Sequence, residues 1–260
     1  MCLVVVALHA HPKYQLVIAA NRDEFHAREA LPAHWGDHPP FAGVLAGRDL
    51  EAGGTWLGVR RDGRWALLTN VREGRGHNNP AAPSRGELVP AVLGDRATPA
   101  AALTAIMRNG DAYNGFNLLT GDVTSAVWVS NRSDTTTAIK AGVHGLSNAL
   151  LDTPWPKVQR TRAALVAWAA QHTDDLAPVF AALSDRNRAP DAALPSTGVS
   201  LEWERLLSAP FIVSADYGTR CATVLAIEGN GNARFIERTF DKLGNATGEV
   251  DFAFEVSSQP

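Results

Sequence analysis

The sequence predicts an α+β protein, a single domain over residues 1–260 in which antiparallel sheets are flanked by helices. The expected elements follow one another as strands, helices, strands, helices and strands. The regular strand–helix alternation of a parallel doubly wound sheet is missing. No internal repeat, linker or low-complexity segment interrupts the 260 residues, which are enough for one ordinary core.

The first elements follow from apolar runs and turn residues. Residues 1–8 and 16–25 contain two apolar runs separated by a polar stretch, which predicts a β-hairpin whose second arm ends in four polar residues, 21–24. Residues 53–59 and 65–71 predict a second hairpin around an Asp-Gly turn. Residues 30–40, rich in Pro and His and without apolar periodicity, predict an ordered surface loop, and residues 72–83 predict another.

The rest of the chain alternates between helical and strand patterns. Ser84 and Glu87 fit a capping box at the start of a helix. Further helices are expected at 99–108, 157–171, 174–183 and 202–207, with a loop at 184–198. Strands are expected at 115–119, 126–129, just before Gly145, and at 211–213, 219–227, 232–239 and 250–254.

Composition excludes several classes of function. Lys and Arg (24) are outnumbered by Asp and Glu (27), and no basic run occurs, so we expect no nucleic-acid partner. The apolar run after Cys2 is too short for a signal peptide or a membrane span. Without a secretion signal, the two cysteines indicate a reducing, cytoplasmic location. There is also no Gly-rich phosphate loop.

Cys2 is the first candidate for chemistry. Removal of the initiator Met would leave Cys2 with a thiol and a free α-amine, a nucleophile that carries its own base. The pKa of an α-amine is about 7.7 to 8.0 and that of a thiol about 8.5, so the amine can accept the thiol proton near neutral pH. The alternative is that Cys2 is a small apolar residue that opens a strand.

The end of the second hairpin arm supplies polar neighbours for Cys2. Arg22 would favour a thiolate or hold a carboxylate or oxyanion, and Asp23 could orient the α-ammonium group. Side chains alternate across a strand, so both can face Cys2 only at a bulge or at the strand end; otherwise we expect Arg22 to face it. The alternative is a solvated strand end.

Three later residues could complete such a site. Asn70 and Asn148 each end an apolar run, and their amides are suitable oxyanion donors, although either could be a turn residue. Arg220 begins an apolar strand, where a buried charge would need a partner, or it is a surface residue at the strand end. Trp35 and Trp155 could line a pocket. The eight histidines match no metal-ligand spacing, and we expect no metal site.

Several short motifs resemble the NRDE-motif family, also called the transport-and-Golgi-organisation family. They are Met1-Cys2, Asn21-Arg22-Asp23-Glu24, Gly54-Thr55-Trp56-Leu57-Gly58, Thr69-Asn70, Ser84-Arg85-Gly86 and Gly145-Leu146-Ser147-Asn148. Members are similar to the N-terminal nucleophile hydrolases, so the resemblance implies their four-layer αββα sandwich.

The choloylglycine hydrolase and penicillin V acylase group is a functional comparison within that superfamily. There an N-terminal Cys attacks an amide, an Arg and an Asp follow on the second strand, two Asn assist at the oxyanion, and a late Arg completes the site. The resemblance assigns these roles to Cys2, Arg22, Asp23, Asn70, Asn148 and Arg220. Asp23 departs from the pattern, because it follows Arg22 directly whereas the hydrolases place the acid a few residues on.

The resemblance leaves two main functions open. The first is a cysteine amidohydrolase or acyltransferase that forms a thioester with a small acylated amide and needs no cofactor. The second is a protein that binds or carries haem, an acyl-CoA or a lipid in the same cleft, with Cys2, His9 or His26 as a haem ligand and Arg22 and Arg220 holding carboxylates. A scaffold without either activity is the third possibility.

Overall fold

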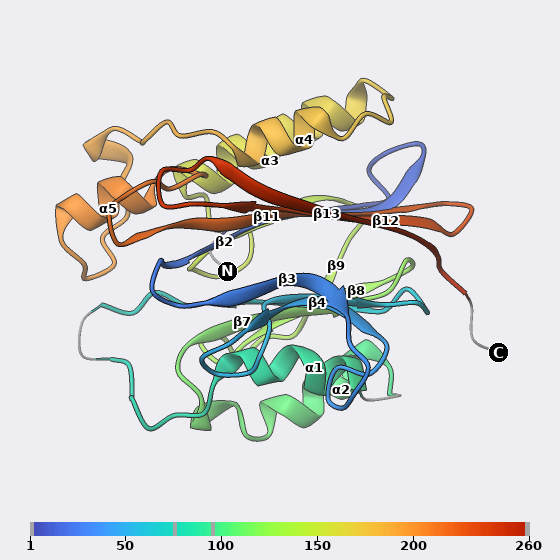
Figure 1. Cartoon of the computed structure of the whole chain (residues 1–260). Helices are drawn as coiled ribbons and strands as arrows, with labels where there is room; N and C mark the ends of the chain where they lie inside the picture. The colour runs from blue at the N-terminus through green and yellow to red at the C-terminus, as the bar shows by residue number, and fades with distance from the viewer. Residues whose placement is uncertain (1–2, 75–76, 95–96, 258–260) are drawn as a thin grey trace.

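The computed structural model describes residues 3–74, 77–94 and 97–257. Two antiparallel sheets lie face to face, with helices on both outer faces (Figure 1). Helices α3 (Pro156–Ala170) and α4 (Ala177–Leu183) cover one sheet, and α1 (Leu88–Gly94) and α2 (Pro99–Met107) cover the other. The predicted α+β class and its four layers are therefore confirmed.

The first sheet has six strands, and the predicted N-terminal hairpin lies at its centre. Its order is β10 (Gly142–Leu146), β1 (Leu3–Leu8), β2 (Tyr14–Phe25), β11 (Tyr217–Glu228), β12 (Asn232–Phe240) and β13 (Ala246–Glu255). The second sheet has seven strands. Its order is β3 (Ala30–Trp35), β4 (Val44–Asp49), β5 (Leu57–Arg60), β6 (Trp65–Asn70), β7 (Phe116–Gly121), β8 (Ala126–Ser130) and β9 (Thr137–Ile139).

Strand β1 shows why these strands are apolar throughout. Val4 and Val6 pack in the core between the two sheets, whereas Val5 and Ala7 pack against the layer of α3 and α4. A strand that is buried on both faces needs apolar residues at every position. The third core lies between the second sheet and helices α1 and α2.

The loop prediction for residues 30–40 is partly wrong. Residues 30–35 form β3, an edge strand of the second sheet, and Pro32 is compatible with that place because it need not donate a ladder hydrogen bond. Strand β4 was not predicted, since Gly47 weakens the strand pattern. Gly47 is required there because a Cβ would lie 2.5 Å from the Trp56 ring.

Two other expectations also differ from the structure. Residues 211–213 lie outside every strand, and the Phe211 N–H donates to the Asp185 carbonyl. Ser84 does cap the turn Arg85–Glu87 ahead of α1, accepting from the Gly86 N–H, but the carboxylate of Glu87 accepts from the Tyr113 hydroxyl and not from the backbone. The short turns Gly110–Ala112 and Asp191–Ala193 and helix α5 (Leu201–Leu207) complete the elements.

Among the described residues, none of the helices combines the length and the apolar character required to span a membrane.

Candidate active site

The candidate site lies at the end of the central hairpin. Leu3, the first described residue, pairs with Asn21 on β2, so the polar residues 21–24 begin where the described part of β1 starts. Cys2, the predicted nucleophile, lies outside the described residues. Arg22 and Asp23 are the first candidate residues within the described part of the chain.

Arg22 points into the space between the two sheets. Its side chain is only 4 % exposed, its guanidinium group lies 4.6 Å from the centre of the Trp56 ring, and Nη2 donates to Asp49 Oδ2 at 2.9 Å. Nη1 is buried and has no hydrogen-bond partner among the described residues. Arg22 is therefore a buried cation fixed by the second sheet and retaining one unused donor.

Asp23 points to the opposite face of the sheet, toward the helices. It is 3 % exposed, and its Oδ1 accepts a 2.6 Å hydrogen bond from the Thr219 hydroxyl. Asn21 lies on the same face and donates to the carbonyls of Leu183 and Pro210. The two adjacent residues Arg22 and Asp23 thus follow strand alternation on β2 and do not converge.

Arg220 is the extra residue of a bulge in β11. Thr219 pairs with Asp23 and Cys221 with Arg22, which leaves Arg220 unpaired between them. Its Nη1 donates to the carbonyls of Phe25 and His26, at 3.2 and 2.8 Å. Burial lowers the pKa of Arg220, and the positive charge of Arg22 lowers it further. The two arginines therefore lie close enough to repel one another.

Asn148 and Asn70 meet across the ends of two strands. Asn148 Nδ2 donates to the Asn70 carbonyl at 3.0 Å, and the Asn148 carbonyl accepts from the Arg72 N–H at 2.8 Å. Asn148 is 6 % exposed, and its Oδ1 faces the guanidinium group of Arg72. One N–H of the Asn148 amide is thus occupied, and an NH₂ group carries a second.

Three adjoining clefts connect these residues. The polar cleft, of about 490 Å³, contains Arg22, Asp49, Asn70 and Arg85 in its wall. The middle cleft, of about 380 Å³, shares Asn70 and Arg85 with it and adds Asn148. The outer cleft, of about 670 Å³, shares Asn148 with the middle one. The structure thus brings Arg22, Asn70 and Asn148 to one continuous surface, and leaves Asp23 off it.

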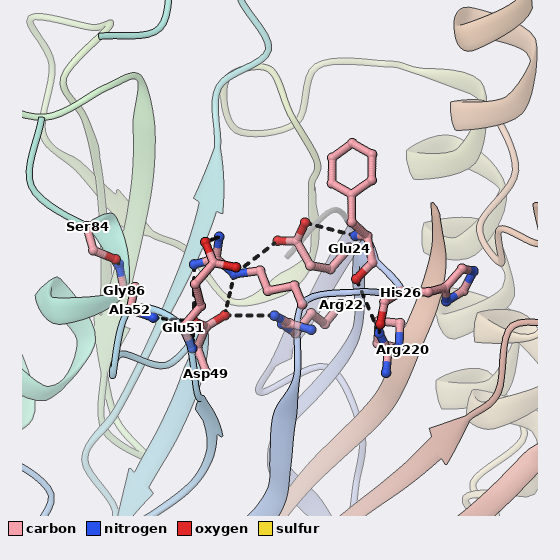
Figure 2. A network of polar contacts seen from close by, with 11 residues as sticks. Arg22, Glu24, His26, Asp49, Glu51, Ala52, Ser84, Gly86 and Arg220 are labelled. Atoms are coloured by element: carbon pink, nitrogen blue, oxygen red, sulfur yellow. Dashed lines mark hydrogen bonds and ion pairs between the residues drawn. The ribbon is translucent and has the colours of Figure 1, made fainter. Parts of the chain in front are cut away.

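Asp49, at the end of β4, is a site residue that the sequence analysis missed. It is 8 % exposed and accepts from Arg22, from Arg28 Nε at 2.6 Å and Nη2 at 3.1 Å, and from the N–H groups of Glu51 and Ala52 (Figure 2). Burial alone would raise the pKa of Asp49. The hydrogen bonds from Arg28 and Ala52 and the charges of Arg28 and Arg22 outweigh burial and hold the pKa below its ordinary value.

Two glycines of the quoted motifs shape the wall of the polar cleft. A Cβ on Gly54 would lie 2.5 Å from the Gly86 carbonyl carbon, and the Thr55 N–H donates to the Gly86 carbonyl at 3.0 Å. The loop before β5 and the turn before α1 therefore touch backbone to backbone. Only glycine allows this approach, which brings the two segments into one wall.

Of the remaining candidates, only Trp155 lies at this surface within the described residues. His9 is in the turn after β1, at the strand end opposite Leu3, and the ring of His26 faces the Ser214 carbonyl. No cluster of three or more potential metal ligands occurs within residues 3–74, 77–94 and 97–257. Trp155 lines the outer cleft and lies under Arg72, whereas Trp35 packs against Arg61 and Phe254. Cys221 is a buried free thiol.

Solved structures with this arrangement define the class of the fold. An N-acylethanolamine-hydrolyzing acid amidase ortholog from Caenorhabditis elegans superposes with a TM-score of 0.51 at 13 % identity, covering 86 % of this chain and 92 % of that one. A variant of the conjugated bile acid hydrolase from Clostridium perfringens gives 0.50 at 10 % identity, covering 99 % and 98 %. The fold is thus that of the N-terminal nucleophile hydrolases.

Sequence relatives then identify the family. Residues 1–242 match the family model described as Transport and Golgi organisation 2. The Transport and Golgi organization protein 2 homolog of Bos taurus is 35 % identical, and that of Homo sapiens is 32 % identical; each match covers 92 % of this chain and 93 % of the relative. The chain belongs to the Transport and Golgi organisation 2 family, which confirms the predicted resemblance.

Proposed function

We propose that the chain is a cysteine N-terminal nucleophile amidohydrolase or acyltransferase that acts on a small acylated amide. The observation that carries this proposal is the pairing of Leu3 with Asn21. This pairing places Leu3, which follows Cys2 in the sequence, opposite the residue that precedes Arg22. Arg22 itself lines the polar cleft. A reacting carbonyl group bound there would have Asn70 and Asn148 on the adjoining wall.

The proposed reaction begins with proton transfer within Cys2. The α-amine takes the thiol proton, and the thiolate sulfur attacks the amide carbon of the substrate. The negative oxygen of the tetrahedral intermediate would accept hydrogen bonds from the Asn70 side chain and from the second N–H of the Asn148 amide. The C–N bond then breaks, and the departing amine takes the proton from the α-ammonium group. The α-amine then takes a proton from water or another acceptor, whose oxygen or nitrogen attacks the thioester carbon. The C–S bond breaks, the acyl group leaves with the acceptor, and the Cys2 thiolate recovers the proton from the α-ammonium group.

Arg22, Arg220 and Asp23 would support this chemistry in different ways. Arg22 is a buried cation whose charge would stabilise a nearby thiolate. Arg220 adds positive charge beside Arg22. Asp23 faces the helices. For Asp23 we keep the proposed role of orienting the α-ammonium group.

The names of the structural neighbours support the same reaction class. One is an acid amidase that hydrolyses N-acylethanolamines and the other a hydrolase of conjugated bile acids. A second structure of the latter protein carries a replacement of its own second residue, a cysteine, by alanine. Those activities belong to those proteins. For this chain they favour an amide as the bond to test first.

The test is covalent trapping. Protein whose intact mass corresponds to loss of Met1 is incubated with a panel of N-acyl amides and analysed by mass spectrometry. We expect an added acyl mass that maps to Cys2, and none in the Cys2→Ala variant. Cys2→Ser is the matched control, because it keeps a weaker nucleophile at the same place. Full retention of Met1 on protein that turns over substrate would contradict the mechanism, since a blocked amine cannot act as the base.

A second candidate function is favoured by the outer cleft. Its wall contains the apolar side chains of Leu150, Trp155 and Pro195, which suits the apolar part of haem, an acyl-CoA or another lipid. Arg72 and Arg132 also line it, each paired with a glutamate, so an acidic group of the ligand would have to share these cations with Glu204 and Glu73. In this alternative the chain binds or carries the ligand without turnover. Haem titration followed by absorbance, repeated with Cys2→Ala, tests thiolate ligation: an unchanged spectrum excludes it. A cytoplasmic location remains part of both proposals.

A further inference from the structure

A separate cavity of about 230 Å³ lies on another side of Arg22, where strand β3 passes near β11 and β12. We call it the rear cavity. Arg22, Trp56 and Arg220 contribute to its wall, together with Glu237 and Thr239. Arg22 and Trp56 line both the polar cleft and this cavity, so an occupant of either space would lie beside the same guanidinium group.

Two guanidinium donors in this wall lack acceptors. Arg22 Nη1 and Arg220 Nε are both buried from solvent, and neither has a hydrogen-bond partner in the part of the chain that the structure describes. Buried donors of charged groups are nearly always paired, because an unpaired one has lost its water without replacement. Two such donors on neighbouring arginines indicate a missing acceptor.

Arg220 also lacks a direct ionic partner. Its hydrogen bonds go to the neutral carbonyls of Phe25 and His26, and it forms no ion pair with any residue of the described ranges. Arg22, by contrast, is paired with Asp49. The guanidinium group of Arg220 can therefore bind an anionic partner.

Glu237 does not supply the missing acceptor. One of its carboxyl oxygens accepts from the Ala33 N–H at 2.8 Å and the other from the Thr223 hydroxyl at 3.1 Å. Burial raises the pKa of Glu237, whereas its hydrogen bonds from Ala33 and Thr223 and the positive charge of Arg22 act in the opposite direction. These two hydrogen bonds connect β12 to β3 and β11. Neither of them involves the guanidinium group of Arg22 or of Arg220.

We propose that the rear cavity is a binding site for a small monocarboxylate, whose two oxygens accept from Arg22 Nη1 and Arg220 Nε. A planar carboxylate offers two acceptor oxygens, one for each unpaired donor, and forms strong charge-assisted hydrogen bonds with guanidinium groups. The cavity reaches the surface beside Leu31 and Thr247, both of which are exposed, so a small acid has a route of entry. The site does not depend on the chemistry proposed for Cys2.

The test follows the N–H resonance of the Arg220 Nε atom in ¹⁵N-labelled protein. Sodium chloride is replaced stepwise by sodium acetate at constant ionic strength and pH. We expect this resonance to move downfield and to saturate, because Nε gains a charged acceptor. The Arg220→Met variant identifies the resonance by its loss. In that variant the apparent affinity for acetate, read from the Arg22 Nε–H signal, should fall at least tenfold.

Control variants distinguish acetate binding in the rear cavity from a general effect of acetate on the protein. Arg234→Met removes an exposed arginine of the same sheet that is already paired with Asp251, and its acetate titration should match the wild type within twofold. Cys2→Ala should also bind acetate as the wild type does, which separates this proposal from the catalytic one. A linear, unsaturated shift of the Arg220 signal would overturn the site. An equal response to inorganic phosphate would overturn its assignment to carboxylates.

Discussion

Asp49 is the residue on which the geometry of Arg22 depends. It comes from the second sheet, whereas Arg22 comes from the first, and its carboxylate accepts from both Arg22 and Arg28 (Figure 2). Strand pairing does not orient the guanidinium group, which lies in the space between the sheets. Asp49 and the Trp56 ring do so instead.

Replacement of Asp49 should therefore destabilise the protein as well as release Arg22. Asp49→Asn keeps the shape of the side chain but leaves the buried cation Arg22 without its charged acceptor, and we expect a loss of about 3 kcal/mol in the free energy of unfolding. Urea denaturation measures this loss. The matched control is Asp251→Asn, because Asp251 pairs with Arg234 on the surface and should cost less than about 1 kcal/mol. Equal losses in both variants would contradict the anchoring role.

The sequence predicted some site residues and missed others for a definable reason. Asn70 and Asn148 were found because each ends an apolar run, a local signal. Asp49 also ends a strand, yet β4 itself was not predicted, since Gly47 breaks its pattern. A polar residue at a strand end can be recognised from the sequence only when the strand itself has been predicted. Cys2, Arg22, Asn70, Asn148, Asp23 and Arg220 retain catalytic roles as predictions.

At the scale of elements, the connection between β10 and α3 positions Asn148. Asp152, with a positive φ of 55°, folds back so that its carboxylate accepts from the Gly145 N–H at 2.8 Å and contacts His144 Nδ1 at 2.7 Å. A Cβ on Gly145 would lie 2.4 Å from Val158, so this glycine allows β10 to approach α3. The loop that carries Asn148 is thus held by the contacts of Asp152 with β10 and by the close packing of β10 against α3.

This connection should make stability depend on pH. The hydrogen bond and charge of Asp152 raise the pKa of His144 above its ordinary value. The stabilising contribution is therefore complete below the unfolded-state pKa of about 6.5 and is lost as pH rises through the folded-state pKa. The wild type should exceed His144→Gln in unfolding free energy by more at about pH 5.5 than at about pH 9.

Chemical denaturation at both pH values measures the difference. Asp152→Asn is the control, because it keeps the side-chain shape and removes the charge that raises the pKa of His144. Its stability should show the same weakened pH dependence as His144→Gln. A gap between wild type and His144→Gln that stays constant across this pH range would contradict the role of the pair.

At the scale of the whole molecule, the two sheets share one core and each also packs on its own helices. Leu103 of α2 and Leu165 of α3 are fully buried in the two outer cores, on opposite sides of the sandwich. The cores are joined through strands that are buried on both faces, such as β1. A single domain over residues 1–260 remains the prediction. It implies that both outer cores unfold in one cooperative transition.

Leu103→Ala and Leu165→Ala should each lower the stability of the same cooperative transition, by about 2 to 5 kcal/mol. Thermal unfolding followed by near-ultraviolet circular dichroism, with hydrogen exchange resolved by segment, measures both the loss and where it occurs. The surface substitution Val166→Ala, on the exposed face of α3, is the control and should change little. Loss of protection confined to one outer layer in either variant would contradict the single domain.

The sequence by itself determined most of the element order, the α+β class, the family resemblance and most of the polar strand ends. These depend on local signals, namely apolar periodicity, turn residues and short motifs. Only the tertiary structure decided which polar residues share a space. The bulge at Arg220 shifts the register of β11 against β2, and Asp49 reaches Arg22 from the other sheet. Both facts depend on how distant strands pack, and strand periodicity carries no information about that packing.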